Sequence, residues 1–98
     1  MAWYVVSYDL RREELTHEAY EAVFTALQSA TDWCRPLLSF WIIETPRTPG
    51  EVISILLNVG AIDDNDGIVV LEITGLGNFR RVIDADVAAW LNTHITRV

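Results

Sequence analysis

Hydrophobic positions run almost without interruption from residue 2 to residue 10, and most of them are Val or aromatic residues. This run contains one carboxylate, Asp9, and two arginines follow it, Arg11 and Arg12. It is much shorter than a membrane-spanning helix. Its β-branched and aromatic content predicts a strand that is buried on both faces and therefore lies in the centre of a sheet.

Helical periodicity follows in two segments. The first begins at Thr16 as the N-cap and ends near residues 29–31. Its apolar stripe consists of Tyr20, Val23, Phe24 and Leu27. The second begins with a capping box formed by Thr48 and Glu51 and ends at Gly60. Its apolar stripe consists of Val52, Ile55, Leu56 and Val59.

The segments between and after these helices are predicted to be extended. Residues 32–45 form two strands, or one sharply bent strand, around residues 38–40. Pro36 places the first part at a sheet edge, because proline donates no ladder hydrogen bond. Residues 68–74 form a strong strand. A short strand at residues 79–83 and a helix capped by Asp84 complete the chain, and the apolar stripe of this helix consists of Val87, Trp90, Leu91 and Ile95.

The element order is therefore strand, helix, strand, strand, helix, strand, with a C-terminal extension. This order predicts one α+β domain over residues 1–98, a ferredoxin-like βαββαβ sandwich with both main helices on one face of the sheet. Right-handed crossovers would place the strands at residues 2–9 and 68–74 at or near the centre of the sheet.

The amino-acid composition bears on the association of subunits and on the cellular location of the chain. The chain of 98 residues is 51% hydrophobic, which is high for so small a domain and indicates a subunit interface. The edge-like segment at residues 33–38 also favours a homodimer. The single cysteine, Cys34, excludes an internal disulfide. With no signal peptide and no transmembrane segment in the sequence, a cytoplasmic location is expected and a membrane partner is not.

The formal net charge is −7, and all seven basic residues are arginines. Because affinity for nucleic acids comes largely from basic side chains that neutralise phosphates, this charge disfavours a general nucleic-acid binder. The arginine pairs at residues 11–12 and 80–81 are candidates for a local basic patch.

For the acidic run at residues 63–67, the histidines, the cysteine and the tryptophans, the sequence favours structural roles. The acidic run at residues 63–67 does not fit a calcium loop, because with Gly67 as the sixth position the first would be Ile62 and the twelfth Ile73. A turn is expected there. His17 and His94 have no sequence-local partner at ligand spacing. Cys34 is expected to be a packed thiol, and the four tryptophans are expected to pack in the core or an interface.

Several short motifs resemble known families. The opening Tyr4–Asp9 strand followed by arginines, and later Ser39-Phe-Trp, resemble the small ferredoxin-like CRISPR-associated proteins that sit between two integrase dimers. Residues 39–45, the Thr-Pro helix start, the strand at residues 67–75 and the late Trp-Leu-Asn resemble the SinR-like family more closely.

The resemblance to the CRISPR-associated family implies a metal-dependent phosphodiesterase, an endonuclease or endoribonuclease. It also implies a homodimer, because in that family the C-terminal extension can lie across the partner. In that reading Asp9 is the catalytic residue and, with its copy from a second protomer, holds Mg²⁺. Arg11 or Arg12 would bind a phosphate, and Ser7 would orient a water. The alternative for Asp9 is a strand-end carboxylate that caps a loop or pairs with Arg11 or Arg12, and for Ser7 it is a buried hydroxyl bonded to the backbone. At the level of function, the alternative is a non-catalytic dimerising protein-interaction module on the same fold.

Overall fold

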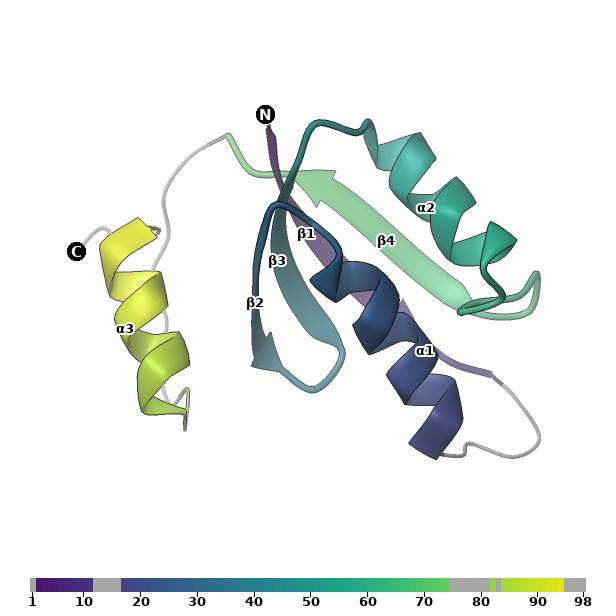
Figure 1. The fold of residues 1–98 in the computed structure, drawn as a ribbon, viewed down its shortest axis with the longest axis horizontal. Helices are drawn as coiled ribbons and strands as arrows, with labels where there is room; N and C mark the ends of the chain where they lie inside the picture. The colour runs from purple at the N-terminus through teal and green to yellow at the C-terminus, as the bar shows by residue number, and fades with distance from the viewer. Residues whose placement is uncertain (1, 12–16, 75–81, 83, 95–98) are drawn as a thin grey trace.

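The computed structural model describes residues 2–11, 17–74, 82 and 84–94, and these form a four-stranded antiparallel sheet and three helices (Figure 1). The elements in chain order are β1 (Ala2–Asp9), α1 (His17–Gln28), β2 (Asp32–Leu37), β3 (Phe40–Thr45), α2 (Pro49–Asn58), β4 (Gly67–Glu72) and α3 (Ala85–His94). The predicted α+β class and the order of the first six elements are confirmed. Among the described residues, none of the helices has the length and apolar character needed to cross a membrane.

The strand order is β2-β3-β1-β4, and every neighbouring pair is antiparallel. The opening run therefore lies in the interior of the sheet, as predicted, paired with β3 on one side and β4 on the other. The prediction for residues 68–74 was wrong, because β4 is an edge strand and β3 is the second interior strand. The apolar run of β4 has one face on the core, whereas Val69 and Leu71 on the other face are 54% and 60% exposed.

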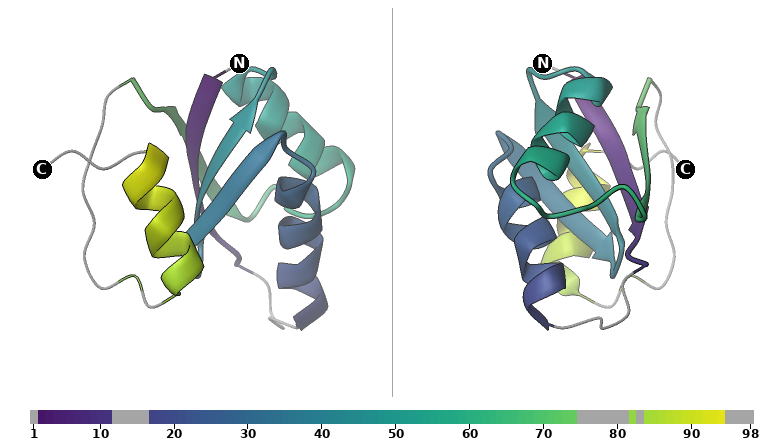
Figure 2. Two further views of the ribbon diagram at one scale, coloured as in Figure 1. Left: turned by 60° about the vertical axis from the view of Figure 1, so that its left-hand side comes forward. Right: turned by 90° about the vertical axis from the view of Figure 1, so that its right-hand side faces the viewer.

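One face of the sheet carries the main core. Helices α1 and α2 lie on this face, and α3 lies on the opposite side of the sheet (Figure 2). Trp41 and Val6 from the two interior strands are almost completely buried there. The predicted stripe of α1 is confirmed, because Val23 and Leu27 are buried and Tyr20 and Phe24 pack against the same core.

The second face carries a smaller cluster beneath α3. Its buried members are Cys34, Ile42 and Leu91. At one end of this cluster, the rings of Trp3 and Trp90 meet edge to face with their centroids 5.4 Å apart. The predicted C-terminal helix is therefore confirmed. Ile95 and, apart from Val82, the predicted strand at residues 79–83 lie outside the described residues.

Residues 32–45 form two strands, β2 and β3, rather than one bent strand. Leu38 and Ser39 form the turn, and Pro36 lies in an edge strand. The pairing register between β2 and β3 shifts between Cys34 and Leu37. This irregular pairing accommodates Pro36, which donates no ladder hydrogen bond.

Helix α2 begins as its sequence predicts. The Thr48 side chain accepts a hydrogen bond from the Glu51 N–H, and the Glu51 carboxylate accepts one from the Thr48 N–H. At the other end, Gly60 has a φ of 75°, a conformation that glycine adopts without strain. The expected burial of Val59 was wrong. The helix ends at Asn58, and Val59 is the C-cap with 62% of its surface exposed.

The capping box gives the first prediction. Thr48→Ala removes the side-chain oxygen that accepts a hydrogen bond from the Glu51 N–H, a group that has no acceptor within the helix. This change should lower the free energy of unfolding by about 1 kcal/mol. Urea denaturation monitored by tryptophan fluorescence measures this change. Thr25→Ala, at an exposed position inside α1, is the control and should leave stability unchanged or slightly raise it. Equal effects of the two substitutions would contradict the role of the cap.

Candidate functional site

The predicted catalytic aspartate is the last residue of β1 and is exposed to solvent. Its Oδ2 accepts a hydrogen bond from Arg11 Nε at 3.2 Å. The side chains of Arg11 and Asp9 are 61% and 73% exposed. An ion pair this open to water contributes little to stability. The pair agrees with the alternative reading of Asp9 as a carboxylate that pairs with a neighbouring arginine.

A distant turn fixes the backbone of Arg11. The Arg11 N–H donates to Asp66 Oδ1 at 2.7 Å, and the Arg11 carbonyl accepts from Asn65 Nδ2 at 2.6 Å. Asp66 Oδ2 also accepts from the Asp63 N–H at 3.0 Å, which closes the turn before β4. The acidic run that was excluded as a calcium loop is therefore a turn, as expected, and it also holds the segment that follows β1.

Gly67 completes this contact. It lies opposite Asp9 in the pairing of β1 with β4, and a Cβ atom placed on it would be 3.0 Å from Arg11 Nη2. A larger residue would therefore press on the guanidinium beside Asp9. The sequence contains a signal for this arrangement in the Asp-Gly pair before β4, but nothing local to the pair identifies Arg11 as its neighbour.

The other predicted site residues are only partly brought together. Ser7 lies two residues before Asp9 on the same face of β1, half-buried, between Phe40 on β3 and Val69 on β4. Its surroundings on the sheet are thus largely apolar. Arg12 lies outside the described residues.

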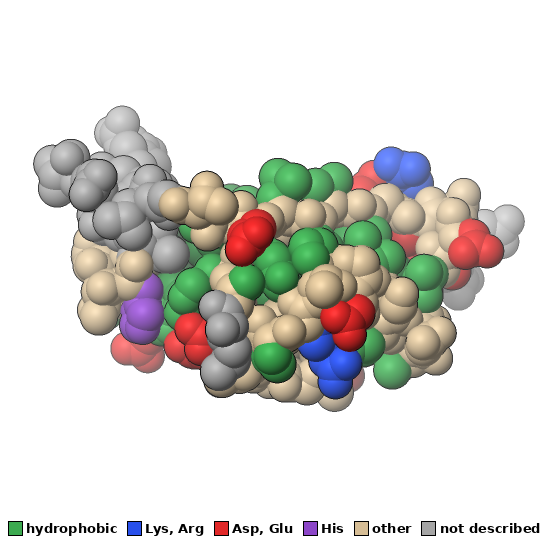
Figure 3. All heavy atoms as spheres, turned by 90° about the horizontal axis from the view of Figure 1, so that it is seen from above, with side chains coloured by type: hydrophobic (Ala, Val, Ile, Leu, Met, Phe, Trp, Pro, Cys, Tyr) green, Lys and Arg blue, Asp and Glu red, His purple; other side chains and the backbone are tan. Residues whose placement is uncertain are grey.

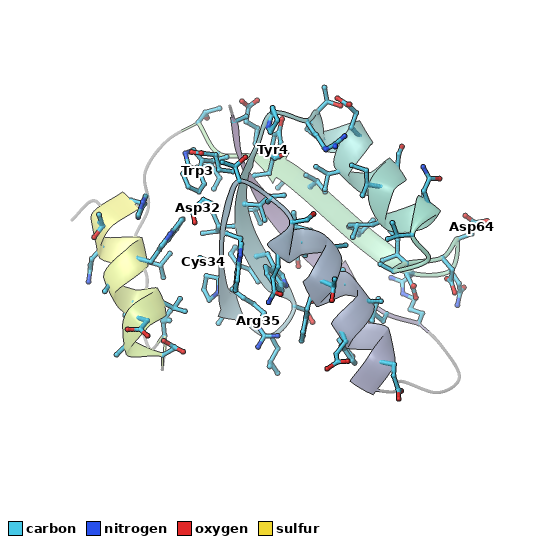
Figure 4. The ribbon with its side chains drawn as sticks, viewed as in Figure 1. Trp3, Tyr4, Asp32, Cys34, Arg35 and Asp64 are labelled. Atoms are coloured by element: carbon cyan, nitrogen blue, oxygen red, sulfur yellow. The ribbon has the colours of Figure 1, made fainter. Side chains whose placement is uncertain are left out.

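Metal ligands do not converge within one copy of the described chain. Among residues 2–11, 17–74, 82 and 84–94, no group of three or more His, Cys, Asp or Glu side chains is placed to hold a metal ion. Two of the carboxylates, Asp32 at the start of β2 and Asp64 in the turn before β4, lie far apart (Figure 4). A Mg²⁺ ion at Asp9 would need further ligands, such as water or a second copy of the chain.

Cys34 has the character of a packed thiol, as expected. It is buried under α3. Burial, together with the negative charges of Asp32 and Asp84, raises the pKa of Cys34 to about 11. The thiolate is the reactive form of cysteine, so at neutral pH this side chain is not a nucleophile.

An aromatic pocket of about 300 Å³ lies beside the edge strand β2. Its lining residues are Phe24, Gln28, Trp33, Arg35, Trp41, Asp84, Asp86 and Val87. The Arg35 guanidinium lies over the Phe24 ring at 4.2 Å and near the Trp41 ring at 5.8 Å. The chain's own cation therefore already contacts the aromatic faces that would attract a cationic ligand.

Comparisons of the chain with protein-family models, with curated proteins and with solved structures gave no match.

The contacts of Asp66 give the second prediction. Asp66→Ala leaves the Arg11 and Asp63 N–H groups without their acceptor and should lower the free energy of unfolding by about 1–2 kcal/mol. Asp64→Ala, an exposed carboxylate in the same turn, should change it by less than about 0.5 kcal/mol. Chemical denaturation of the two variants measures the difference. If Asp64→Ala costs as much as Asp66→Ala, the turn does not depend on these two hydrogen bonds.

Proposed function

We propose that this chain is a homodimerising protein-interaction module with the ferredoxin-like fold, related to the SinR-like proteins and more distantly to the CRISPR-associated adaptation proteins. The split connection supports this fold assignment. Helix α1 joins β1 to β2, which flank β3, and α2 joins β3 to β4, which flank β1. Two interleaved units of this kind are the βαββαβ arrangement.

The observation that carries the proposed function is an uncovered apolar strip on the sheet face that α3 shares. Val69 and Leu71 of β4, which lie on this face, are more than half exposed. Exposed apolar side chains grouped in this way favour contact with another protein.

The distribution of charge also favours a protein partner over nucleic acid. Seen from above, hydrophobic side chains gather in a band along the molecule, with acidic side chains around it and few arginines (Figure 3). With a net charge of −7, the chain as a whole repels a phosphate backbone. Association with a protein through uncharged apolar contacts is not opposed by this repulsion.

The third prediction is that the purified chain is a dimer. Light scattering after size exclusion should give twice the chain mass of 11.1 kDa at micromolar concentration. The physical reason is that pairing removes the apolar strip from water. A mass of 11.1 kDa at every concentration up to the millimolar range would contradict the proposed function.

A second candidate function is a Mg²⁺-dependent phosphodiesterase with Asp9 as ligand and catalytic residue. The exposed position of Asp9 at a strand end, next to the guanidinium of Arg11, favours it. A hard carboxylate oxygen suits Mg²⁺, and a guanidinium suits a phosphate. The remaining ligands would come from water and from a second protomer.

The fourth prediction separates the two candidates. A nuclease should cleave RNA or DNA only with Mg²⁺ or Mn²⁺, and Asp9→Asn should abolish cleavage without lowering the melting temperature, because the Asp9–Arg11 pair is exposed. Asp64→Asn is a matched change at another exposed carboxylate and should leave cleavage intact. Under the interaction-module proposal, wild type and Asp9→Asn show the same trace cleavage, and that result would end the nuclease candidate.

A further inference from the structure

The two edges of the sheet differ in how well they are protected against pairing with another strand. Edge strand β2 carries Pro36, the charged Arg35 and a register shift, which all hinder strand addition. Edge strand β4 has no proline, and its only charged residue is Glu72 at the end. Among the described elements, β4 is therefore the edge that is open to another strand.

The hydrogen-bond pattern shows which groups of β4 point outward. The Ile73 N–H donates to the Trp3 carbonyl at 2.8 Å. Because hydrogen-bonded and non-hydrogen-bonded pairs alternate in an antiparallel ladder, the backbone groups of Leu71 and Val69 also face β1. The N–H and C=O groups of the even-numbered residues 68, 70 and 72 then point away from β1. Within the described part of the chain, β1 is the only strand that pairs with β4.

We infer that β4 pairs with β4 of a second copy of this chain, antiparallel across a two-fold axis, with Val70 opposite its own counterpart. This inference rests on the proposed dimerising function and assigns its interface. The two four-stranded sheets then become one continuous sheet of eight strands. The outward groups of residues 68, 70 and 72 gain partners, and the apolar strips of the two copies join.

The uncharged and self-complementary pattern of β4 favours a second copy of the chain as the occupant. Two chains that each carry −7 repel one another overall, so they associate at least cost where the surface is uncharged, and β4 is uncharged from Gly67 to Leu71. In the inferred register, Glu72 faces Ile68 of the partner subunit and Val69 faces Leu71 of the partner subunit. Because of the two-fold symmetry, the pairing of Val69 with Leu71 occurs twice. Each time it joins two exposed apolar side chains.

Neighbouring registers that keep the side chains on matching faces are worse electrostatically. A shift toward Val69 at the axis places Glu72 opposite Asp66 of the partner subunit, which sets two carboxylates against each other. A shift toward Leu71 at the axis brings the two copies of Glu72 to within two positions, about 7 Å along the strands. With Val70 at the axis they are four positions apart, about 14 Å.

This dimer keeps the two copies of Asp9 apart. Asp9 lies in line with Gly67 on β1, so the two aspartates are separated by six positions along the strands and three strand spacings across the sheet. This amounts to about 25 Å, too far for both to bind one metal ion. The inferred interface therefore agrees with an interaction module and opposes a shared metal site at Asp9.

The experiment compares variants at the two edges by light scattering, with circular dichroism to confirm folding. V69E/L71E should halve the mass of the wild-type dimer, because it places four carboxylates at the interface; V69K/L71K is its substitute if the acidic variant does not fold. L37E/L38E introduces the same charges at exposed leucines of the β2–β3 hairpin, and it should remain dimeric. Loss of the dimer in L37E/L38E but not in V69E/L71E would overturn the inference and place the interface at the β2 edge.

The register has its own test in the variant V69K/L71E. The introduced lysine lies opposite the introduced glutamate of the partner subunit only if Val70 lies at the axis, so this variant should be a dimer that weakens as salt is raised. A monomeric V69K/L71E would overturn the register. If wild type is monomeric, the proposed function itself fails. If wild type and V69E/L71E are both dimeric, only the assigned interface is wrong.

Discussion

The hydrogen bonding of β1 along both of its sides is the constraint on which the rest of the structure depends. The strand pairs with β3 from Ala2 to Ser7 and with β4 from Tyr4 to Asp9. Its core face is polar at two points, and both are satisfied: the Tyr4 hydroxyl donates to the Arg47 carbonyl at 2.7 Å, and the Tyr8 hydroxyl accepts from Trp41 Nε1 at 3.1 Å. Burial raises the pKa of Tyr8, so its hydroxyl stays neutral. The interior strand thus fixes the positions of both helix layers.

The two faces of the sheet are covered unequally, and the proposed function follows from this difference. Helices α1 and α2 cover one face, whereas α3 packs over β2 and β3 and leaves Val69 and Leu71 of β4 exposed. The same strand forms the less protected edge of the sheet. At the end of β1, Asp9 is paired with Arg11 and the turn before β4 holds this segment in place. The uncovered face of β4 is therefore apolar, which suits the proposed association.

Local sequence signals predicted much of this fold. The capping box at Thr48, the glycine after α2, the strand boundary around residues 38–40 and the edge position of Pro36 each depend on neighbours within a few residues. The place of β4 could not be predicted in this way. An apolar strand gives the same pattern whether its second face is covered by its own chain or by a partner. The contact of Arg11 with Asp66 joins residues 55 positions apart, which no local pattern specifies.

Amide hydrogen exchange along β4, followed by nuclear magnetic resonance as a function of protein concentration, tests the central claim most directly. The N–H groups of Val69 and Leu71 point to β1 and should be protected at every concentration. Those of Ile68, Val70 and Glu72 point outward, so they should exchange quickly in dilute protein and become protected as the dimer forms. Rapid exchange of these three amides in a sample that is fully dimeric would contradict the account.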